Sequence, residues 1–410
     1  MTPEEHRISR REIAPSALKV LYRLHREGFE AYLVGGSVRD LLLGRSPKDF
    51  DIGTDARPDQ VRRLFRNSRI IGRRFRLVHV IFHDTILEVS TFRRTPDPDA
   101  QSREDDLVTS DNTYGSPRED AFRRDFTVNG LFYRVGDRSV ADYVGGIEDL
   151  DKKIIRVIGE PQLRFREDPV RMFRACEFAG RLDFGIEVKT ADAIQANVEE
   201  IRKASPARMI EELVQLLVSG SCAAAFDWMF ELELLDEFLP EVCDIIQDVG
   251  TGEGFSGLLD AIDRVDGENL SQDVMLAAIL VPGIVNRRAA LESRGHVKRK
   301  RLDLIVERAI ADLLQRFALS NVRRHRLFEI LTTFQRLCEP MPDGNAAERL
   351  ASRHAFADAC DLFAMVVDAT GGGEEALTEW QELRRSTAKL RSRARPPRPR
   401  KRRRGRRRRR

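Results

Sequence analysis

Two aspartates separated by one residue are the clearest candidates for chemistry in this sequence. They are Asp49 and Asp51, in the stretch Lys48-Asp-Phe-Asp-Ile52. Side chains at i and i+2 of a strand point to the same face, so the two carboxylates are expected to project together. Carboxylates held that close repel each other unless a cation lies between them, and Mg²⁺ prefers such hard oxygen ligands. A solvated acidic strand end is the alternative, and a glycine pair just upstream favours a metal–nucleotide site.

That glycine pair lies in Leu33-Val-Gly-Gly-Ser-Val-Arg-Asp40. Gly35 and Gly36 stand between an expected strand and an expected short helix, where the backbone can approach a ligand closely. The N–H groups at a helix start favour a phosphate, and Arg39 lies one turn further on. An ordinary strand–turn–helix connection explains these residues as well.

Two further clusters combine arginines with acids. In Arg123-Arg124-Asp125 the arginines are candidates for phosphate binding and the acid for completing a metal site. In the segment from Arg164 to Arg174, a proline at position 169 favours a helix start that puts Arg171 and Arg174 on one face. A surface ion pair and a solvated helix start are the respective alternatives.

The elements that must position these residues can be predicted from the apolar pattern. Strands are expected at 31–34, 50–52, 77–82, 85–92, 127–135 and 139–144, and helices at 16–27, 38–43 and 58–66. Residues 94–121 are rich in Pro, Asp, Ser and Gly and are expected to form a mobile loop. From about residue 160 the pattern is helical for over two hundred residues. This order predicts a small mixed α/β domain followed by a helical region.

The net charge conceals an uneven distribution. The 410 residues include 70 Lys or Arg and 66 Asp or Glu, for a net charge of +4. Residues 391–410 hold fourteen basic residues and no acid, which leaves a body of net charge −10. Such a segment is expected to be disordered and to bind phosphates by counterion release.

Several classes of protein are excluded. The longest apolar stretch, Val274 to Val285, has 12 residues with a Pro-Gly pair inside it, too short to span a bilayer. The N-terminal residues lack the apolar core of a signal peptide. Five cysteines lie far apart without a CxxC pair, which argues against disulfides or a cysteine zinc site. A cytoplasmic protein is therefore expected.

Five ordered motifs then resemble one family. LVGGSVRD, KDFDI, RRDFTVNG, DYVGGIEDL and REDPVRMFRA occur in the order and spacing of the class II nucleotidyltransferases, which comprise bacterial poly(A) polymerases and CCA-adding enzymes. The resemblance implies a polymerase-β-like α/β head with a five-stranded mixed sheet, all-α neck and body domains, and a disordered basic tail. The expected divisions are an N-terminal helical extension at 1–27, the head at 28–150, the neck at 151–220, the body at 221–375 and the tail at 376–410.

The same resemblance assigns roles. The family transfers a nucleotidyl group from an NTP to an RNA 3′-hydroxyl without a template and releases pyrophosphate. Asp49 and Asp51 would hold two Mg²⁺ ions, with Mn²⁺ as a substitute, and either Asp125 or Glu88 would be the third carboxylate. The nucleotide-binding residues implied by the motifs are Gly35, Gly36, Arg39, Arg124, Asp168, Arg171 and Arg174, with Asp168 and Arg171 reading the base.

A basic segment favours one branch of the family. Arg69 to Val80 resembles the signature of bacterial poly(A) polymerases, and its Arg73, Arg74 and Arg76 are candidate RNA contacts. Arg402, Arg403 and Arg404 in the tail are further candidates, because a basic tether suits unrelated RNA 3′ ends. We therefore expect a poly(A) polymerase acting with ATP on RNA 3′ ends. A CCA-adding tRNA nucleotidyltransferase and a catalytically silent RNA-binding protein are the alternatives.

Overall fold

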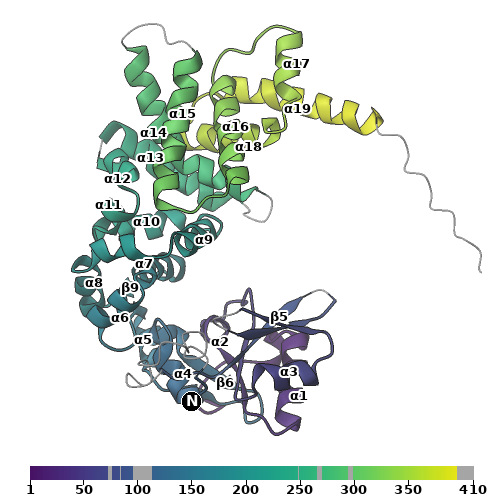
Figure 1. Ribbon diagram of the computed structural model, residues 1–410, viewed down its shortest axis with the longest axis vertical. Helices are drawn as coiled ribbons and strands as arrows, with labels where there is room; N and C mark the ends of the chain where they lie inside the picture. The colour runs from purple at the N-terminus through teal and green to yellow at the C-terminus, as the bar shows by residue number, and fades with distance from the viewer. Residues whose placement is uncertain are drawn as a thin grey trace, which may run out of the picture. The chain divides into compact units, whose positions relative to one another are not determined.

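The computed structural model describes residues 1–72, 76–83, 85–95, 113–247, 249–265, 270–293 and 299–394. The chain forms two compact units. The first comprises Met1–Ala204 and Ala224–Phe238, and the second comprises Ser205–Ala223 and the chain from Leu239 onward. Figure 1 shows a sheet in the first unit and helices in the second. An α/β head followed by helical domains, as predicted, is confirmed.

The head is built on a mixed sheet of seven strands in the order β3-β4-β5-β2-β1-β6-β7. Only β2 and β5 pair in parallel, and the other neighbours are antiparallel. The count of five strands was therefore too low. The missed strand β3 carries Arg69 on an exposed edge, so its apolar alternation is weak. The bounds are β1 Ala31–Val34, β2 Asp51–Thr54, β3 Ser68–Ile71, β4 Leu77–Ile81, β5 Ile86–Thr91, β6 Leu131–Arg134 and β7 Val140–Asp142.

Helices cover one face of β3, β4 and β5 and leave the other face partly open. Val78 and Val80 of β4 and Leu87 and Val89 of β5 are buried, whereas the alternate residues of both strands are half-buried or exposed. Helix α3 (Pro58–Leu64) packs on these strands, and α1 (Pro15–Arg26) packs on β1 and β2 (Figure 1). The remaining head helices are α2 Gly36–Leu42, α4 Pro117–Arg123 and α5 Gly146–Lys152.

Two local predictions in the head were wrong. Residues 127–129 form a short 3-10 turn, and the strand β6 begins only at Leu131. The β-branched Thr127 and Val128 imitate a strand in sequence, but the Thr127 hydroxyl donates to Asp149 and the turn carries both side chains inward. Helix α4 occupies part of the expected loop, because Ser116 caps it in a capping box with Glu119. The central part of that loop, 96–112, lies outside the described residues.

Helices complete the first unit around a two-stranded parallel sheet of β8 and β9. Phe165, Phe173 and Phe178 are buried there and anchor the helices that follow the head. The bounds are β8 Ile154–Ile155, α6 Pro161–Glu167, α7 Val170–Leu182, β9 Gly185–Ile186, α8 Val188–Gln195, a 3-10 helix Val198–Lys203, α10 Cys222–Glu231 and α11 Leu234–Phe238.

The second unit is helical throughout its described part. Its core contains Phe334, Phe363 and the fully buried Trp380. The bounds are α9 Pro206–Leu217, α12 Pro240–Gln247, α13 Val249–Arg264, α14 Gln272–Glu292, α15 Arg299–Arg316, α16 Asn321–Leu337, α17 Asn345–Ala351, α18 Phe356–Thr370 and α19 Glu374–Ala394.

Helix α14 is longer than the apolar run predicted from sequence. Among the described residues it is the one helix that by length and composition would be able to cross a membrane, and half of its most apolar window is buried in the protein. Pro282 lies inside it without ending it, so the helix extends to Glu292. The side chains from Val274 to Val281 are all buried, as in a core helix.

The expected tail also begins later than predicted. Residues from 376 to 394 belong to α19, and Trp380 donates its indole N–H to the Leu337 carbonyl at 3.2 Å. Trp380 is fully buried and anchors this otherwise polar helix. Residues 395–410, which the sequence predicts to be disordered, lie outside the described residues. The domain borders expected after residues 150 and 220 stay predictions. The first break between the two compact units lies after Ala204.

Candidate functional site

Strand register brings the glycine pair and two carboxylates to the same end of the sheet. Asp51, the first residue of β2, pairs with Val34, the last residue of β1 before Gly35. Strand β5 runs parallel to β2 with Val89 beside Ile52, so Glu88 lies beside Asp51. Laterally neighbouring residues project from the same face of a sheet. The side chains of Asp51 and Glu88 therefore share one face, next to the glycine turn.

The electrostatics of Asp51 reflect this crowding. The pKa of Asp51 is raised to about 6, chiefly by burial and then by the charges of Glu88 and Asp49, while Arg124 opposes the rise. Although the side chain of Asp51 is exposed by surface area, protein atoms surround enough of it for desolvation to be the largest cause. Asp49, Asp51 and Glu88 thus form an acidic group beside a single arginine.

This acidic group fits a divalent cation chemically. Carboxylates that raise one another's pKa are stabilised by a positive charge, and oxygen donors suit Mg²⁺ or Mn²⁺. In the part of the chain that the structure describes, no three acidic, histidine or cysteine side chains are close enough together to form an assembled metal centre. Glu88 is about half exposed, and its side chain is 52% accessible.

Gly35 and Arg124 lie against each other beside these carboxylates. Gly35 has a φ of 71°, and a Cβ there would lie 2.9 Å from Arg124 Nη1, so a side chain is excluded on both counts. Arg124 Nη2 pairs with Asp120 at 3.2 Å, and Nη1 donates to the Asn129 carbonyl at 3.4 Å. Its buried Nε has no acceptor among the described residues. Arg124 is thereby held facing the position where a phosphate would approach.

Arg39 occupies an interior position rather than an open one. Its side chain is 3% exposed and donates to Asn129 Oδ1 at 2.5 Å and to Asp40 Oδ1 at 2.8 Å. Its guanidinium also lies 5.3 Å from the ring centroid of Phe178. Burial lowers the pKa of Arg39 despite the neighbouring Asp40. The structure therefore places Arg39, a predicted phosphate ligand, in the protein interior next to the glycine turn.

Asp125 belongs to a second cluster. Arg174 of α7 forms two contacts of 3.0 Å with its Oδ2, and Oδ1 accepts from the Phe126 N–H at 2.8 Å and from Asn129 at 3.2 Å. Burial alone would raise the pKa of Asp125, but Arg174 and these hydrogen bonds outweigh it and lower the pKa. Asp125 therefore joins the head to α7.

The predicted base-reading residues lie beside this second cluster. Arg171 donates to the Arg164 carbonyl at 3.0 Å and lies 3.6 Å from Glu167. Asp168 is the C-cap of α6 and is followed by Pro169, the N-cap of α7. Burial lowers the pKa of Arg171, and the charge of Arg164 adds to this effect. Asp168 and Arg171 thus stand at the junction of α6 and α7.

Sequence reasoning missed two polar residues that connect these groups. Asn129 bridges Arg39 and Asp125 through its side chain. His79 contacts Glu88 Oε1 through Nε2 at 3.1 Å. The position of Asn129 in the RRDFTVNG motif was the available signal, whereas the His79 contact depends on the register of β4 and β5.

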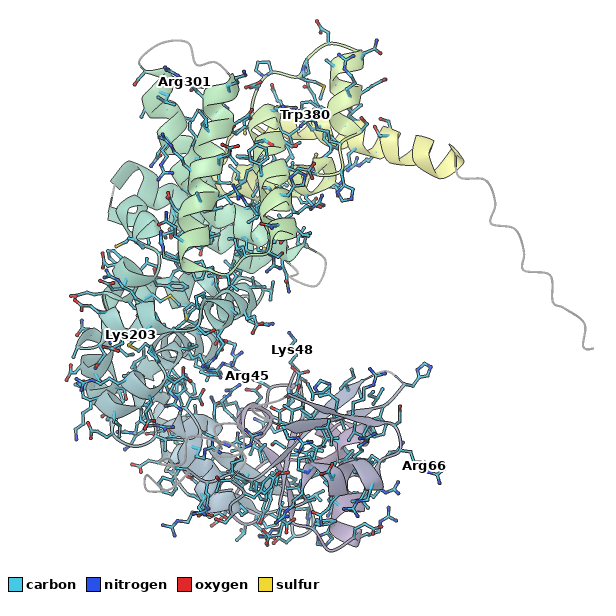
Figure 2. The ribbon with its side chains drawn as sticks, in the orientation of Figure 1. Arg45, Lys48, Arg66, Lys203, Arg301 and Trp380 are labelled. Atoms are coloured by element: carbon cyan, nitrogen blue, oxygen red, sulfur yellow. The ribbon has the colours of Figure 1, made fainter. Side chains whose placement is uncertain are left out.

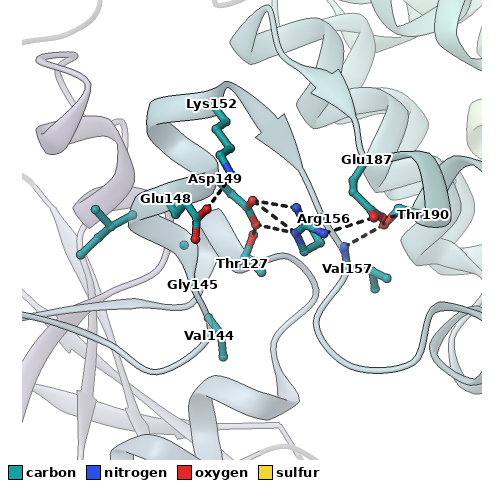
Figure 3. A network of polar contacts seen from close by, with 12 residues as sticks. Thr127, Val144, Gly145, Glu148, Asp149, Lys152, Arg156, Val157, Glu187 and Thr190 are labelled. Atoms are coloured by element: carbon teal, nitrogen blue, oxygen red, sulfur yellow. Dashed lines mark hydrogen bonds and ion pairs between the residues drawn. The ribbon is translucent and has the colours of Figure 1, made fainter.

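The DYVGGIEDL motif serves local structure. Asp142 accepts four backbone N–H groups, from residues 144 to 147, and so fixes the start of α5. Asp149 accepts from Thr127 at 2.6 Å and forms an ion pair with Arg156, which also pairs with Glu187 (Figure 3). This network joins the head to the small β8–β9 sheet and its helix α8.

The predicted RNA contacts are only partly described. Arg73, Arg74, Arg402, Arg403 and Arg404 lie outside the described residues. Arg76 immediately precedes β4, and its carbonyl accepts from Arg93 at 3.0 Å.

Known proteins share both the sheet-based head and the helices after it. Residues 31–156 match a family model described as the poly A polymerase head domain, and residues 183–246 match one described as a probable RNA and SrmB-binding site of polymerase A. The fold is that of nucleotidyltransferases.

Individual relatives agree with this class. A Salmonella typhi protein named poly(A) polymerase I is 49% identical over 245 residues, which are 58% of this chain and 53% of that protein, so the match spans about half of the relative. The Haemophilus influenzae poly(A) polymerase I is 34% identical over 91% of this chain and 85% of its own. A Bacillus stearothermophilus CCA-adding enzyme in complex with CTP superposes with a TM-score of 0.65 at 27% identity, over 92% and 84% of the two chains. The chain belongs to the nucleotidyltransferase family of poly(A) polymerases and CCA-adding enzymes.

Proposed function

We propose that this protein is a template-independent poly(A) polymerase that adds AMP from ATP to RNA 3′ ends and releases pyrophosphate. The observation that carries the proposal is the acidic group of Asp49, Asp51 and Glu88 beside the Gly35 turn and Arg124. The relatives named poly(A) polymerase I favour ATP as the nucleotide. We propose further that the protein acts in the cytoplasm, in RNA polyadenylation and turnover. The same proposal includes a role in mRNA processing linked to transcription.

In the proposed mechanism the carboxylates of Asp49 and Asp51 hold Mg²⁺, with Mn²⁺ as a substitute. The bound ions stabilise the charge that develops on the attacking 3′-oxygen and on the leaving pyrophosphate. The chain itself positions the reactants: the backbone turn at Gly35 and Gly36 admits the triphosphate, and Arg124 donates to its oxygens.

We infer that Glu88, rather than Asp125, is the third carboxylate. Glu88 projects from the same face as Asp51 and raises its pKa, whereas both oxygens of Asp125 accept hydrogen bonds from protein donors. Releasing Asp125 for a metal would leave Arg174 without this partner. Asp125 is therefore proposed to hold α7 against the head.

We further propose that Asp168 and Arg171 read the adenine edge of ATP, because an arginine and a carboxylate present donors and acceptors at fixed positions. Arg39 and Arg174 then support this arrangement from within the protein, through Asn129 and Asp125. Arg73, Arg74, Arg76 and the tail arginines remain proposed RNA contacts.

The test is extension of an unstructured RNA with Mg²⁺ and each NTP in turn. Long extension with ATP alone supports the proposal, whereas addition confined to tRNA ends that requires CTP identifies a CCA-adding enzyme. Asp51→Asn is expected to abolish extension, and Asp151→Asn, an exposed site on α5, serves as the matched control. Full extension by an Asp49→Ala variant would remove the metal role of Asp49, whereas RNA binding without extension by any NTP would favour a silent RNA-binding protein.

A further inference from the structure

A second groove in the head lies on the side of the sheet covered by helices, away from the face that carries Asp51 and Glu88. Its volume is about 660 Å³, and its walls come from α1, the residue after α3 and the β4–β5 hairpin. None of the described residues that line it is acidic. We call it the α1 groove and define it by Lys19, Tyr22, Arg23, Arg26, Phe65 and Phe82.

The basic side of the α1 groove is a row on one helix face. Lys19, Arg23 and Arg26 are four and three residues apart, so they project in the same direction over about 10 Å of helix. All three are exposed. Basic residues in a last turn also stabilise the helix dipole, which accounts for Arg23 and Arg26 but not for Lys19, two turns before the helix end. The row presents positive charge to solvent without a lining acid to neutralise it.

The other side of the α1 groove is aromatic. Arg23 stacks over the ring of Phe65 at 5.3 Å, and Tyr22 and Phe82 are half-buried. The hairpin that carries Phe82 is fixed to the segment after α3, because Asn67 donates to the Ile81 carbonyl at 2.7 Å. Arg66, exposed at the end of α3 and labelled in Figure 2, adds charge near this wall. The groove is thus a preformed surface of cations and rings.

This composition distinguishes between anionic partners. Aromatic rings interleaved with arginines and lysines bind single-stranded nucleic acid, because bases stack on the rings while cations contact phosphates. An acidic amphipathic helix would require an aliphatic floor, and the lining contains no Leu, Ile, Val or Met. The chemistry of the groove therefore fits an unpaired polynucleotide strand.

We propose that the α1 groove is a second RNA-binding site in the head, which holds the single-stranded RNA upstream of the 3′ end being extended. The choice of RNA as occupant rests on the proposed function. The site is separate from the acidic group, so it contributes to retention of long RNAs and not to nucleotide addition itself.

The test measures binding of fluorescently labelled oligoadenylates to the full chain over a range of salt concentrations. Each lost phosphate contact lowers the slope of log affinity against log salt by about 0.7 for a single strand. For a 20-mer, Lys19→Ala and Arg26→Ala are each expected to lower this slope by about 0.7, and the double variant is expected to lower it by about 1.4. Phe82→Leu is expected to weaken 20-mer binding on the order of tenfold. Lys152→Ala, an exposed lysine on α5, is the matched control for lost charge.

Extension of a 6-mer with ATP, too short to occupy both sites, is expected to stay at the wild-type rate in every variant and reports on the fold. An unchanged 20-mer slope in Lys19→Ala/Arg26→Ala, alongside normal 6-mer extension, would overturn the groove while leaving the polymerase proposal intact. The reverse result, a lowered slope in a protein that never incorporates AMP, would reject the polymerase and keep the groove. If the wild-type protein binds poly-glutamate and the double variant loses this binding but still binds RNA, the occupant of the α1 groove is an acidic protein and not RNA.

Discussion

Lowering the pH from 7 to 5 should weaken the binding of Mg²⁺ to the protein through one carboxyl group, Asp51. The pKa of Asp51 is raised to about 6 by burial and then by the charge of Glu88. A metal ligand must be ionised, so protons and Mg²⁺ compete for this side chain. At pH 7 about nine-tenths of Asp51 is ionised and at pH 5 about one-tenth, which predicts an affinity about tenfold lower at pH 5.

The same shift has a consequence for stability in the absence of metal. The folded pKa of Asp51 lies above its value in an unfolded chain, near 3.9. The protonated group therefore stabilises the fold fully below pH 4, and this contribution is lost as the pH rises through 6. A shift of about two pKa units corresponds to about 3 kcal/mol for a fully buried group. Because the side chain is exposed by area, screening reduces the expected effect to about 1 kcal/mol.

The assay is the chemical shift of the Asp51 carboxyl carbon against pH in metal-free protein, together with Mg²⁺ titrations at pH 5 and 7. Glu88→Gln removes a like charge and should move the Asp51 midpoint downward. Asp137 is an internal reference, since slight burial is outweighed by hydrogen bonds from Ser139 and its pKa is lowered. A midpoint of Asp51 near 4, or equal Mg²⁺ affinities at the two pH values, would refute the reasoning.

Three other predictions concern single side chains. Glu88→Gln should reduce Mg²⁺-dependent extension on the order of 100-fold at little cost in stability. Asp125→Asn should instead lower the free energy of unfolding by about 3 kcal/mol, because the ion pair with Arg174 is lost. The opposite pattern in extension assays and urea unfolding would transfer the metal role to Asp125. Trp380→Ala should cost about 3 to 5 kcal/mol in urea unfolding, and a negligible loss would mean that α19 is not packed. Gly35→Ala should weaken ATP binding more than Gly28→Ala does. Both glycines have positive φ, but a Cβ at Gly35 would meet Arg124, whereas a Cβ at Gly28 meets nothing within 4 Å. Equal effects of the two substitutions in an ATP titration would assign the loss of binding to backbone strain alone.

Local patterns predicted the elements of the head better than its connections. Asp51 and the Gly-Gly turn lie at the predicted end of the sheet, whereas Asp49 precedes β2, so the expected i, i+2 strand geometry of the two aspartates stays a prediction. The parallel pairing of β2 with β5 joins residues 37 positions apart, such as Ile52 and Val89, and no local pattern contains it. For this reason Glu88 and Asp125 were equivalent in sequence and became different only through strand register.

Burial was the other quantity that the sequence did not contain. Arg39 and Arg124 both follow motif positions typical of phosphate ligands, yet one is in the interior and the other lies beside Gly35. Trp380 lies in a stretch rich in charged residues, and its partner, the Leu337 carbonyl, lies 43 positions away. Composition described the average character of these segments, and long-range contacts decided the role of each side chain.

The path of the chain between its two compact units limits how the protein can be recombined. The chain crosses from one unit to the other after Ala204, after Ala223 and after Phe238, and the second crossing falls inside helix α10. Neither unit is therefore a continuous stretch of sequence. A chimera with a relative of different RNA preference must exchange α10 and α11 together with the first 204 residues, because a single junction would separate the first unit from two of its own helices.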